Sequence, residues 1–282
     1  MTAVTYEAEY NNRERVPEHV GIMERWAAAS VAARSSLKAD LDVPYGPGPR
    51  HRYDLFHGAS PTSPLVVYIH GGYWQRGERE VNAFVARELV ARGVAVALPS
   101  YTLCPDGSIA DIVGEMRAFL ASLWVRTRQY PVVVGHSAGG HLAAAVLAAG
   151  VPPVADVPPD MVRAAYSISG VFDLAPLIDT SLNVALKLDE ASANAVSPIF
   201  WPPPAKSCRF VAAVGGAESS EFLRQNLNMA GVWSAADVKA ECVVVPAANH
   251  FTIVDELARP DSMMLARIHE LAVWCASGPA TA

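Results

Sequence analysis

The chain has 282 residues, of which 51% are hydrophobic and 18% are charged. This length and composition predict one α/β domain over residues 1–282 with a large buried core. The net charge is −6 without a basic run, so nucleic acid and anionic membranes are poor partners. The longest apolar stretch, Leu142–Ala149, is too short to span a bilayer. The first twelve residues are polar and acidic, which is unlike a signal segment.

Strands and helices alternate along the chain, which predicts a mainly parallel sheet with helices on both faces. We expect strands at 50–57, 64–69, 93–98, 132–134, 164–169, 209–214 and 241–245. We expect helices at 17–37, 78–92, 108–128, 141–149, 220–231 and 261–275, with Gly150 as a helix stop. Residues 174–208 interrupt the alternation, which indicates either a cap or access segment or a plain surface excursion.

A glycine-rich loop follows the strand at 64–69. Its sequence is His70-Gly71-Gly72-Tyr73-Trp74, and consecutive glycines after a strand can turn backbone N–H groups into a cleft, as in esterase oxyanion loops. We expect the N–H groups of Gly72, Tyr73 and Ala138 to bind an oxyanion. His70 is expected to brace the loop.

The strand at 132–134 leads into Gly135-His136-Ser137-Ala138-Gly139, which matches the Gly-x-Ser-x-Gly nucleophile elbow. Three fixed positions filled by residues at roughly 7% each arise by chance in about one chain in ten of this length. The β-branched strand before the motif and the Ala/Leu-rich helix after it make a chance match less plausible, because the elbow joins a strand to a helix. We therefore predict that Ser137 is a catalytic nucleophile.

A serine nucleophile needs a base, which follows it and the acid in the chain order of this type of elbow. Of the eight histidines, only His250 and His269 come late enough. His269 lies in a predicted amphipathic helix. His250 lies in a short loop after a strand, where an imidazole can reach the serine, so we predict it as the base.

Two carboxylates at strand ends are candidates for the orienting acid. Glu218 follows the strand at 209–214, and Asp173 follows the strand at 164–169. We favour Glu218, because its strand directly precedes the strand that carries the His250 loop. Asp173 stays the alternative.

At this point the chain resembles the arylformamidase, or kynurenine formamidase, branch of the α/β-hydrolases. The similar elements are Tyr10-Asn-Asn-Arg13, His70-Gly-Gly-Tyr-Trp74, Tyr101-Thr-Leu-Cys-Pro105, Gly135-His-Ser-Ala-Gly-Gly-His141 and Glu218-Ser-Ser-Glu-Phe222. The resemblance implies an α/β-hydrolase fold and a triad of Ser137, Glu218 and His250. The branch usually has Asp where this chain has Glu218, and the longer Glu stem requires a shifted backbone. It also contains general esterases and amidases.

The sequence therefore predicts a serine hydrolase for small-acyl aryl amides such as N-formylkynurenine. A broad aryl or short-acyl esterase or amidase is the alternative, and a non-catalytic binding protein is a third hypothesis. Tyr73 and Trp74 are the main candidates for the substrate pocket, and the other aromatic candidates could equally be core: Phe172, Trp201, Phe222 and Phe251. His141, on the elbow helix, is expected to pack.

No metal-ligand spacing or phosphate loop occurs in the sequence, so we expect neither a metal nor a cofactor. The four scattered cysteines are expected to be reduced thiols in a cytoplasmic protein. The sequence leaves a homodimer open.

Overall fold

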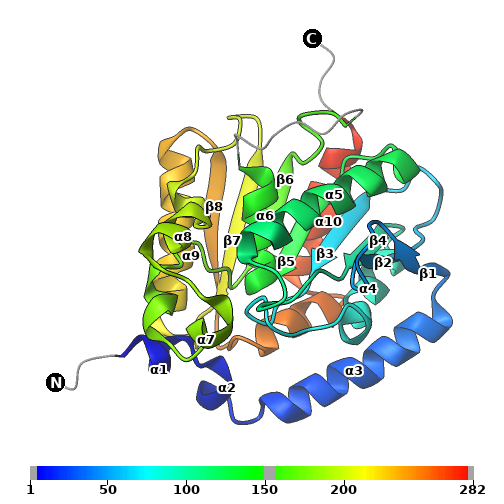
Figure 1. Ribbon diagram of the computed structural model, residues 1–282. Coiled ribbons are helices and arrows are strands. Elements are labelled where there is room, and N and C mark those ends of the chain that lie inside the picture. The colour runs from blue at the N-terminus through cyan, green and yellow to red at the C-terminus, as the bar shows by residue number, and fades with distance from the viewer. Residues whose placement is uncertain (1–4, 149–156, 279–282) are drawn as a thin grey trace.

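The computed structural model describes residues 5–148 and 157–278, and its centre is one eight-stranded sheet (Figure 1). The strand order is β1-β2-β4-β3-β5-β6-β7-β8. All neighbouring pairs from β4 to β8 are parallel, whereas β2 pairs antiparallel with both β1 and β4. The strands are β1 (Ala39–Pro44), β2 (Arg52–Phe56), β3 (Leu65–Ile69), β4 (Ala95–Pro99), β5 (Val132–His136), β6 (Ala164–Ile168), β7 (Arg209–Gly215) and β8 (Lys239–Val245). The predicted mainly parallel sheet is confirmed.

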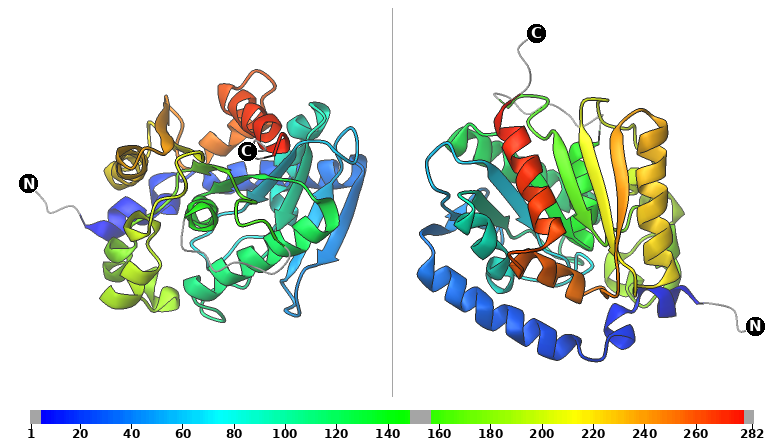
Figure 2. Two further views of the ribbon diagram at one scale, coloured as in Figure 1. Left: turned by 90° about the horizontal axis from the view of Figure 1, so that it is seen from above. Right: turned by 180° about the vertical axis from the view of Figure 1, so that it is seen from behind.

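Helices cover both faces of the sheet, as expected from the alternation (Figure 2). One face packs against α5 (Ile109–Thr127), α6 (Ala138–Leu147) and α9 (Ser220–Ala235). The other face packs against α4 (Ala86–Ala91) and α10 (Met263–Ala276). The central strands are buried on both faces and rich in Val, Ile and Ala, as parallel strands between two helix layers require.

The N-terminal part of the chain runs along the carboxyl ends of the parallel strands, at the bottom of Figure 1. It contains α1 (Tyr6–Tyr10), α2 (Asn12–Arg15) and α3 (His19–Ser36). Trp26 of α3 stacks on Phe84 and donates a hydrogen bond of 2.6 Å to Asp255 Oδ1. These contacts hold α3 against the loops that carry the site.

Residues 174–208 form four short helical pieces. They are the 3₁₀ turn η2 (Ala175–Asp179), α7 (Asn183–Leu186), α8 (Glu190–Ala195) and the 3₁₀ turn η3 (Pro198–Phe200). His141 Nε2 on α6 lies 2.7 Å from the carbonyl oxygen of Val196, and Ser197 Oγ accepts from the N–H of Leu174. The first bond joins the segment to α6, and the second joins the start of the segment to Ser197 within it.

Besides the helical pieces in residues 174–208, four described elements were not predicted from the sequence: α1, α2, β1 and the 3₁₀ turn η4 (Thr252–Ala258). The edge strand β1 alternates apolar residues with two aspartates and is only partly buried; this alternation is a strand signal that the sequence analysis did not use. Its pairing with β2 decides its conformation. Helix α6 ends at Leu147; Ala149 and the predicted stop Gly150 lie outside the described residues.

Candidate active site

Ser137 occupies a strained turn between β5 and α6. Its backbone has φ 56° and ψ −117°, which is left-handed and costly for a residue with a side chain. The two motif glycines have no room for a Cβ, because one built on Gly135 would lie 2.0 Å from the carbonyl oxygen of Gly139, and one built on Gly139 would lie 2.0 Å from that of Ile69. The motif therefore has the elbow geometry that its sequence predicted.

The imidazole of His250 lies beside the carboxylate of Glu218. His250 follows β8, and its Nδ1 lies 2.7 Å from Glu218 Oε2. The Glu218 side chain is fully buried, and His250 is 5% exposed. A proton on Nδ1 is thus held by a carboxylate, which leaves Nε2 as the proton acceptor.

The second oxygen of Glu218 is also fixed. Its Oε1 accepts hydrogen bonds from Ser169 Oγ at 2.5 Å and from the N–H of Gly215 at 2.7 Å. Ser169 directly follows β6 and has a φ of 53°, which is unusual for serine. The sequence reasoning missed Ser169, although its place at a strand end was a signal.

Asp173, the alternative acid, lies in a different set of contacts. Its N–H donates to Gln225 Oε1, its Oδ1 accepts from the N–H of Ala175, and its Oδ2 lies 3.9 Å from an Arg224 nitrogen. Within residues 5–148 and 157–278, no hydrogen bond joins Asp173 to His250.

Ser137 and His250 line the same cavity. In the described part of the chain, no hydrogen bond joins Ser137 Oγ to the His250 ring. Bonds between a nucleophile and its base are often long or misaligned before substrate binds. The two side chains share the cavity, but they are not yet paired.

Gly72 and Tyr73 of the glycine-rich loop line this cavity. Gly72 (φ 117°) and Tyr73 (φ 51°) have left-handed backbones, and neither N–H has an intramolecular acceptor among the residues that the structure covers. Ala138 is the first residue of α6, where a helical N–H has no partner in the helix. The oxyanion role that the sequence analysis assigned to these three N–H groups stays a prediction.

Buried histidines support the site. His136 Nε2 lies 2.8 Å from the carbonyl oxygen of His250, and burial lowers the pKa of His136 well below its usual value. The His70 ring stacks on Tyr101 at 4.4 Å and its Nδ1 lies 2.8 Å from the carbonyl oxygen of Gly71. His70 thus braces the loop, as expected, whereas the role of His136 was missed.

The cavity has a volume of about 700 Å³. Tyr73 and Phe251 line it, together with Trp26 and His19 of α3, which the sequence did not identify. Trp74 is fully buried, packs edge-on against His141 at 4.9 Å and does not line the cavity, so its predicted pocket role is wrong. Tyr73 and Trp74 are adjacent in the loop, but Tyr73 lines the cavity and Trp74 lies in the core. The lining also excludes Phe172, Trp201 and Phe222.

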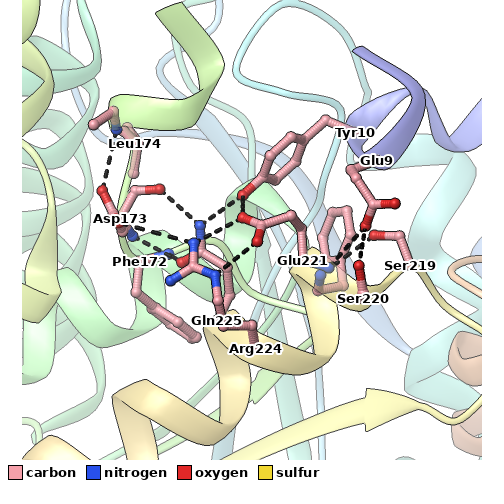
Figure 3. Close-up of polar contacts among 12 residues, drawn as sticks. Glu9, Tyr10, Phe172, Asp173, Leu174, Ser219, Ser220, Glu221, Arg224 and Gln225 are labelled. Atoms are coloured by element: carbon pink, nitrogen blue, oxygen red, sulfur yellow. Dashed lines mark hydrogen bonds and ion pairs between the residues drawn. The ribbon is translucent and has the colours of Figure 1, made fainter. Parts of the chain in front are cut away.

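A polar cluster ties α1 to α9, directly after Glu218 (Figure 3). Glu9 Oε2 accepts hydrogen bonds from Ser220 Oγ at 2.7 Å and from the N–H of Glu221 at 2.9 Å, so it caps α9. The Tyr10 hydroxyl donates to Glu221 Oε2 at 2.8 Å and accepts from Gln225 Nε2 at 2.9 Å. The sequence reasoning assigned no role to these contacts.

The same segment contacts the glycine-rich loop. The Tyr73 hydroxyl donates a hydrogen bond of 2.6 Å to the carbonyl oxygen of Tyr10 and accepts one of 3.2 Å from Asn12 Nδ2. Tyr10 is therefore bonded both to the helix that follows the acid and to the loop with the free N–H groups. Burial raises the pKa of Tyr10, so its hydroxyl stays protonated at neutral pH.

Among the described residues, no group of three His, Cys, Asp or Glu side chains could hold a metal ion. None of the described helices has both the length and the apolarity to cross a membrane. The four cysteines are free thiols, and burial raises the pKa of Cys275 to about 12.

Comparison with known proteins gives the family context. Residues 54–195 match the family described as BD-FAE. Kynurenine formamidase from Danio rerio is 34% identical over 236 residues, which cover 80% of this chain and 79% of that protein.

Solved structures give the fold context. The crystal structure of a candidate thioesterase from Silicibacter sp. superposes with a TM-score of 0.85 at 33% identity and covers 93% of this chain and 98% of its own. Esterase B from Lactobacillus rhamnosis superposes with a TM-score of 0.67 at 21% identity, over 92% of this chain and 97% of its own. The fold is that of the α/β-hydrolases.

Proposed function

We propose that this chain, which belongs to the kynurenine formamidase family of α/β-hydrolases, cleaves small-acyl aryl amides with Ser137, His250 and Glu218 as a catalytic triad. N-formylkynurenine is the leading substrate. The observation that carries the proposal is the hydrogen bond of 2.7 Å between His250 Nδ1 and a fully buried Glu218 carboxylate, in the cavity that also contains Ser137.

The reaction has two steps. His250 Nε2 takes the proton of Ser137 as the hydroxyl oxygen attacks the formyl carbon, and it returns this proton to the leaving aryl amine. A water molecule, deprotonated by His250, then attacks the formyl-serine ester; the bond to Ser137 Oγ breaks, His250 returns the proton to this oxygen, and formate is released. Glu218 holds the imidazole tautomer and stabilises the imidazolium in both steps.

The negative charge of each tetrahedral intermediate falls on the former carbonyl oxygen. The N–H groups of Gly72, Tyr73 and Ala138 are assigned to this oxygen, because each is free within the described chain and the loop and helix start adjoin Ser137. A Cβ on Gly71 would lie 3.0 Å from Ser137 Cβ. This close packing on the loop side supports a small acyl group.

Glu218 replaces the Asp that is usual in this branch. Its longer side chain reaches His250 from a position where Ser169 and the N–H of Gly215 also bond to it. These two donors stabilise the charged carboxylate. The bonds from Ser169 and Gly215 hold the Glu218 carboxylate in the position from which it contacts His250.

An esterase or amidase of broad aryl or short-acyl preference is the second candidate. The likeness to esterases and the cavity volume of about 700 Å³ favour it, because a cavity of that size admits more than one small aryl substrate. The relatives are enzymes, which argues against a non-catalytic binding protein.

The architecture is proposed to be one domain over residues 1–282, because both apolar clusters pack on the two faces of one sheet. Residues 174–208 are proposed as an access segment, since Thr180, Ser181 and Leu182 line the cavity. Cytoplasmic location and homodimer formation stay predictions from the sequence.

The test is kcat/KM along an acyl series from formyl to octanoyl on one aryl amine and on the matching phenol. The proposal expects the formyl amide to be the best amide, with short aryl esters also cleaved, because an apolar pocket discriminates by only ~1–3 kcal/mol per methylene. Fast ester cleavage with slow formamide cleavage would favour the esterase. A steady rise of kcat/KM with acyl length would contradict both the formamidase and the short-acyl esterase.

A further inference from the structure

Two arginines line the catalytic cavity without a protein partner. Arg13 lies on α2 and Arg76 follows the glycine-rich loop, and both line the cavity with Ser137 and His250. In the described part of the chain, neither side chain makes a hydrogen bond or an ion pair. Both side chains are exposed, so both can meet a bound molecule.

Arg76 lies close to the proposed oxyanion loop. Its N–H donates to the carbonyl oxygen of Gly72, and its Cγ would lie 3.0 Å from a Cβ built on Gly72. Arg13 is contributed to the same cavity by the N-terminal segment. Partial burial and then the charge of Arg76 lower the pKa of Arg13, which agrees with two like charges near each other.

Among the described residues, Arg13 and Arg76 lack the carboxylate partners that several other arginines of this chain have. The chain has 28 Asp and Glu against 22 Lys and Arg, and other arginines, such as Arg50 and Arg79, are paired with carboxylates. Two neighbouring cations repel each other unless an anion lies between them. Their guanidinium groups suit a carboxylate, which can accept two parallel hydrogen bonds from each.

Two carboxylates also line this cavity. Glu7 is already bonded to Ser181, at 2.7 Å to its N–H and 2.9 Å to its Oγ. Glu24 of α3 is exposed and makes no ion pair within the described residues. The cavity lining thus has two unpaired cations, Arg13 and Arg76, and one unpaired carboxylate, Glu24, among the described residues. This charge distribution suits a substrate that carries both a carboxylate and an ammonium group.

We propose that Arg13 and Arg76 form a recognition site for a carboxylate on the leaving-group side of the substrate. The inference rests on the proposed function, because a formyl group has no carboxylate and the anion must then belong to the aryl amine. It adds a selectivity that the triad cannot give: neutral formanilides bind without this contact, whereas aryl formamides with an amino-acid side chain gain it.

The test compares two formamides that share an ortho-acyl aryl amine. N-formylkynurenine has the carboxylate and N-formyl-2′-aminoacetophenone has none. In Arg13→Gln and Arg76→Gln, kcat/KM for N-formylkynurenine is expected to fall by about fivefold each and by more than about tenfold in the double variant, mainly through KM. The neutral formamide is expected to keep its kcat/KM within about twofold, which also shows that the variants fold.

The matched control is Arg87→Gln, an exposed arginine on α4 that does not line the cavity. It should change neither substrate. An equal loss on both formamides, or no loss on N-formylkynurenine, would overturn the carboxylate site.

A second readout does not depend on formamide cleavage. Kynurenine and neutral 2′-aminoacetophenone are compared as inhibitors of phenyl acetate hydrolysis. Kynurenine should inhibit the wild type more strongly, and the double variant should lose this difference. Failure to cleave formamides with the inhibition difference intact would overturn the proposed function and keep the carboxylate site; equal inhibition by both compounds would overturn the site alone.

Discussion

The elbow around Ser137 and the N-terminal segment 6–15 contribute to one cavity by different means. The elbow is fixed by neighbouring residues: a strand, two glycines without room for a Cβ, and a helix start. The N-terminal segment consists of helices of five and four residues, which are too short to persist alone. Contacts to α9 and to Tyr73 hold it in place. The proposed nucleophile, Ser137, thus lies in a motif fixed by its neighbours in sequence. The proposed carboxylate-binding residue Arg13 lies in a segment that residues distant in sequence hold in place.

The largest effect is expected at the elbow. Ser137→Ala should lower kcat by about 10⁴- to 10⁶-fold, because the covalent step is lost. The fold should persist, as judged by circular dichroism and thermal melting. A variant with a tenth of wild-type turnover would contradict the assignment, as would activity that disappears in EDTA and returns with zinc.

The next effect separates the two candidate acids. Glu218→Ala should lower kcat by about 10³- to 10⁴-fold, since the imidazole loses the group that holds its tautomer. Glu218→Asp should keep partial activity. Asp173→Asn is the matched control and should keep most of it; the reverse ranking, measured under the same conditions, would transfer the role to Asp173.

Acid should lower the stability of the elbow side of the cavity, where His70 of the glycine-rich loop and His141 of α6 are buried. Burial lowers the pKa of His70 and of His141 to about 4, whereas an unfolded histidine has a pKa of about 6.5. The unfolded chain therefore binds more protons in this interval, and stability present above about pH 6.5 is lost as the pH falls towards 4.

The slope should reach about 1.4 kcal/mol per pH unit for each of these histidines. Urea unfolding at pH 7, 6 and 5 measures it. His141→Gln should flatten the dependence, whereas His269→Gln, on α10, serves as the control. Identical slopes in wild type and His141→Gln would contradict the role of burial.

The smallest effect is expected in the N-terminal segment. Tyr10→Phe removes the hydroxyl that bonds to Glu221 and Gln225, and should cost about 1–2 kcal/mol in unfolding free energy. If the segment positions the cavity wall, kcat/KM should also fall by about tenfold or less. Tyr6→Phe, at a half-exposed tyrosine of the same helix, is the control. Unchanged activity with lowered stability would leave the segment a purely structural role.

Much of the fold followed from the sequence because the central strands and major helices have strong apolar patterns. The predicted strand at 164–169 and the helix at 108–128 agree with β6 and α5 within about one residue, well inside the usual boundary error. Helices α1 and α2 were missed because they are short and depend on distant partners. Strand β1 was missed although its apolar and charged residues alternate. Trp74 was misplaced because adjacent residues of a turn can face opposite sides.

The sequence by itself determined the elbow, the glycine-rich loop and the order of the candidate triad, since each depends on residue types at short spacing. Only the tertiary structure decided which carboxylate meets His250, since Glu218 and Asp173 both follow strands and only the sheet order and Ser169 distinguish them. It also decided that Arg13 and Arg76, which are 63 positions apart in the sequence, line one cavity. Contacts between distant segments leave no periodic pattern in the sequence, because they arise only when the sheet brings its loops to one edge.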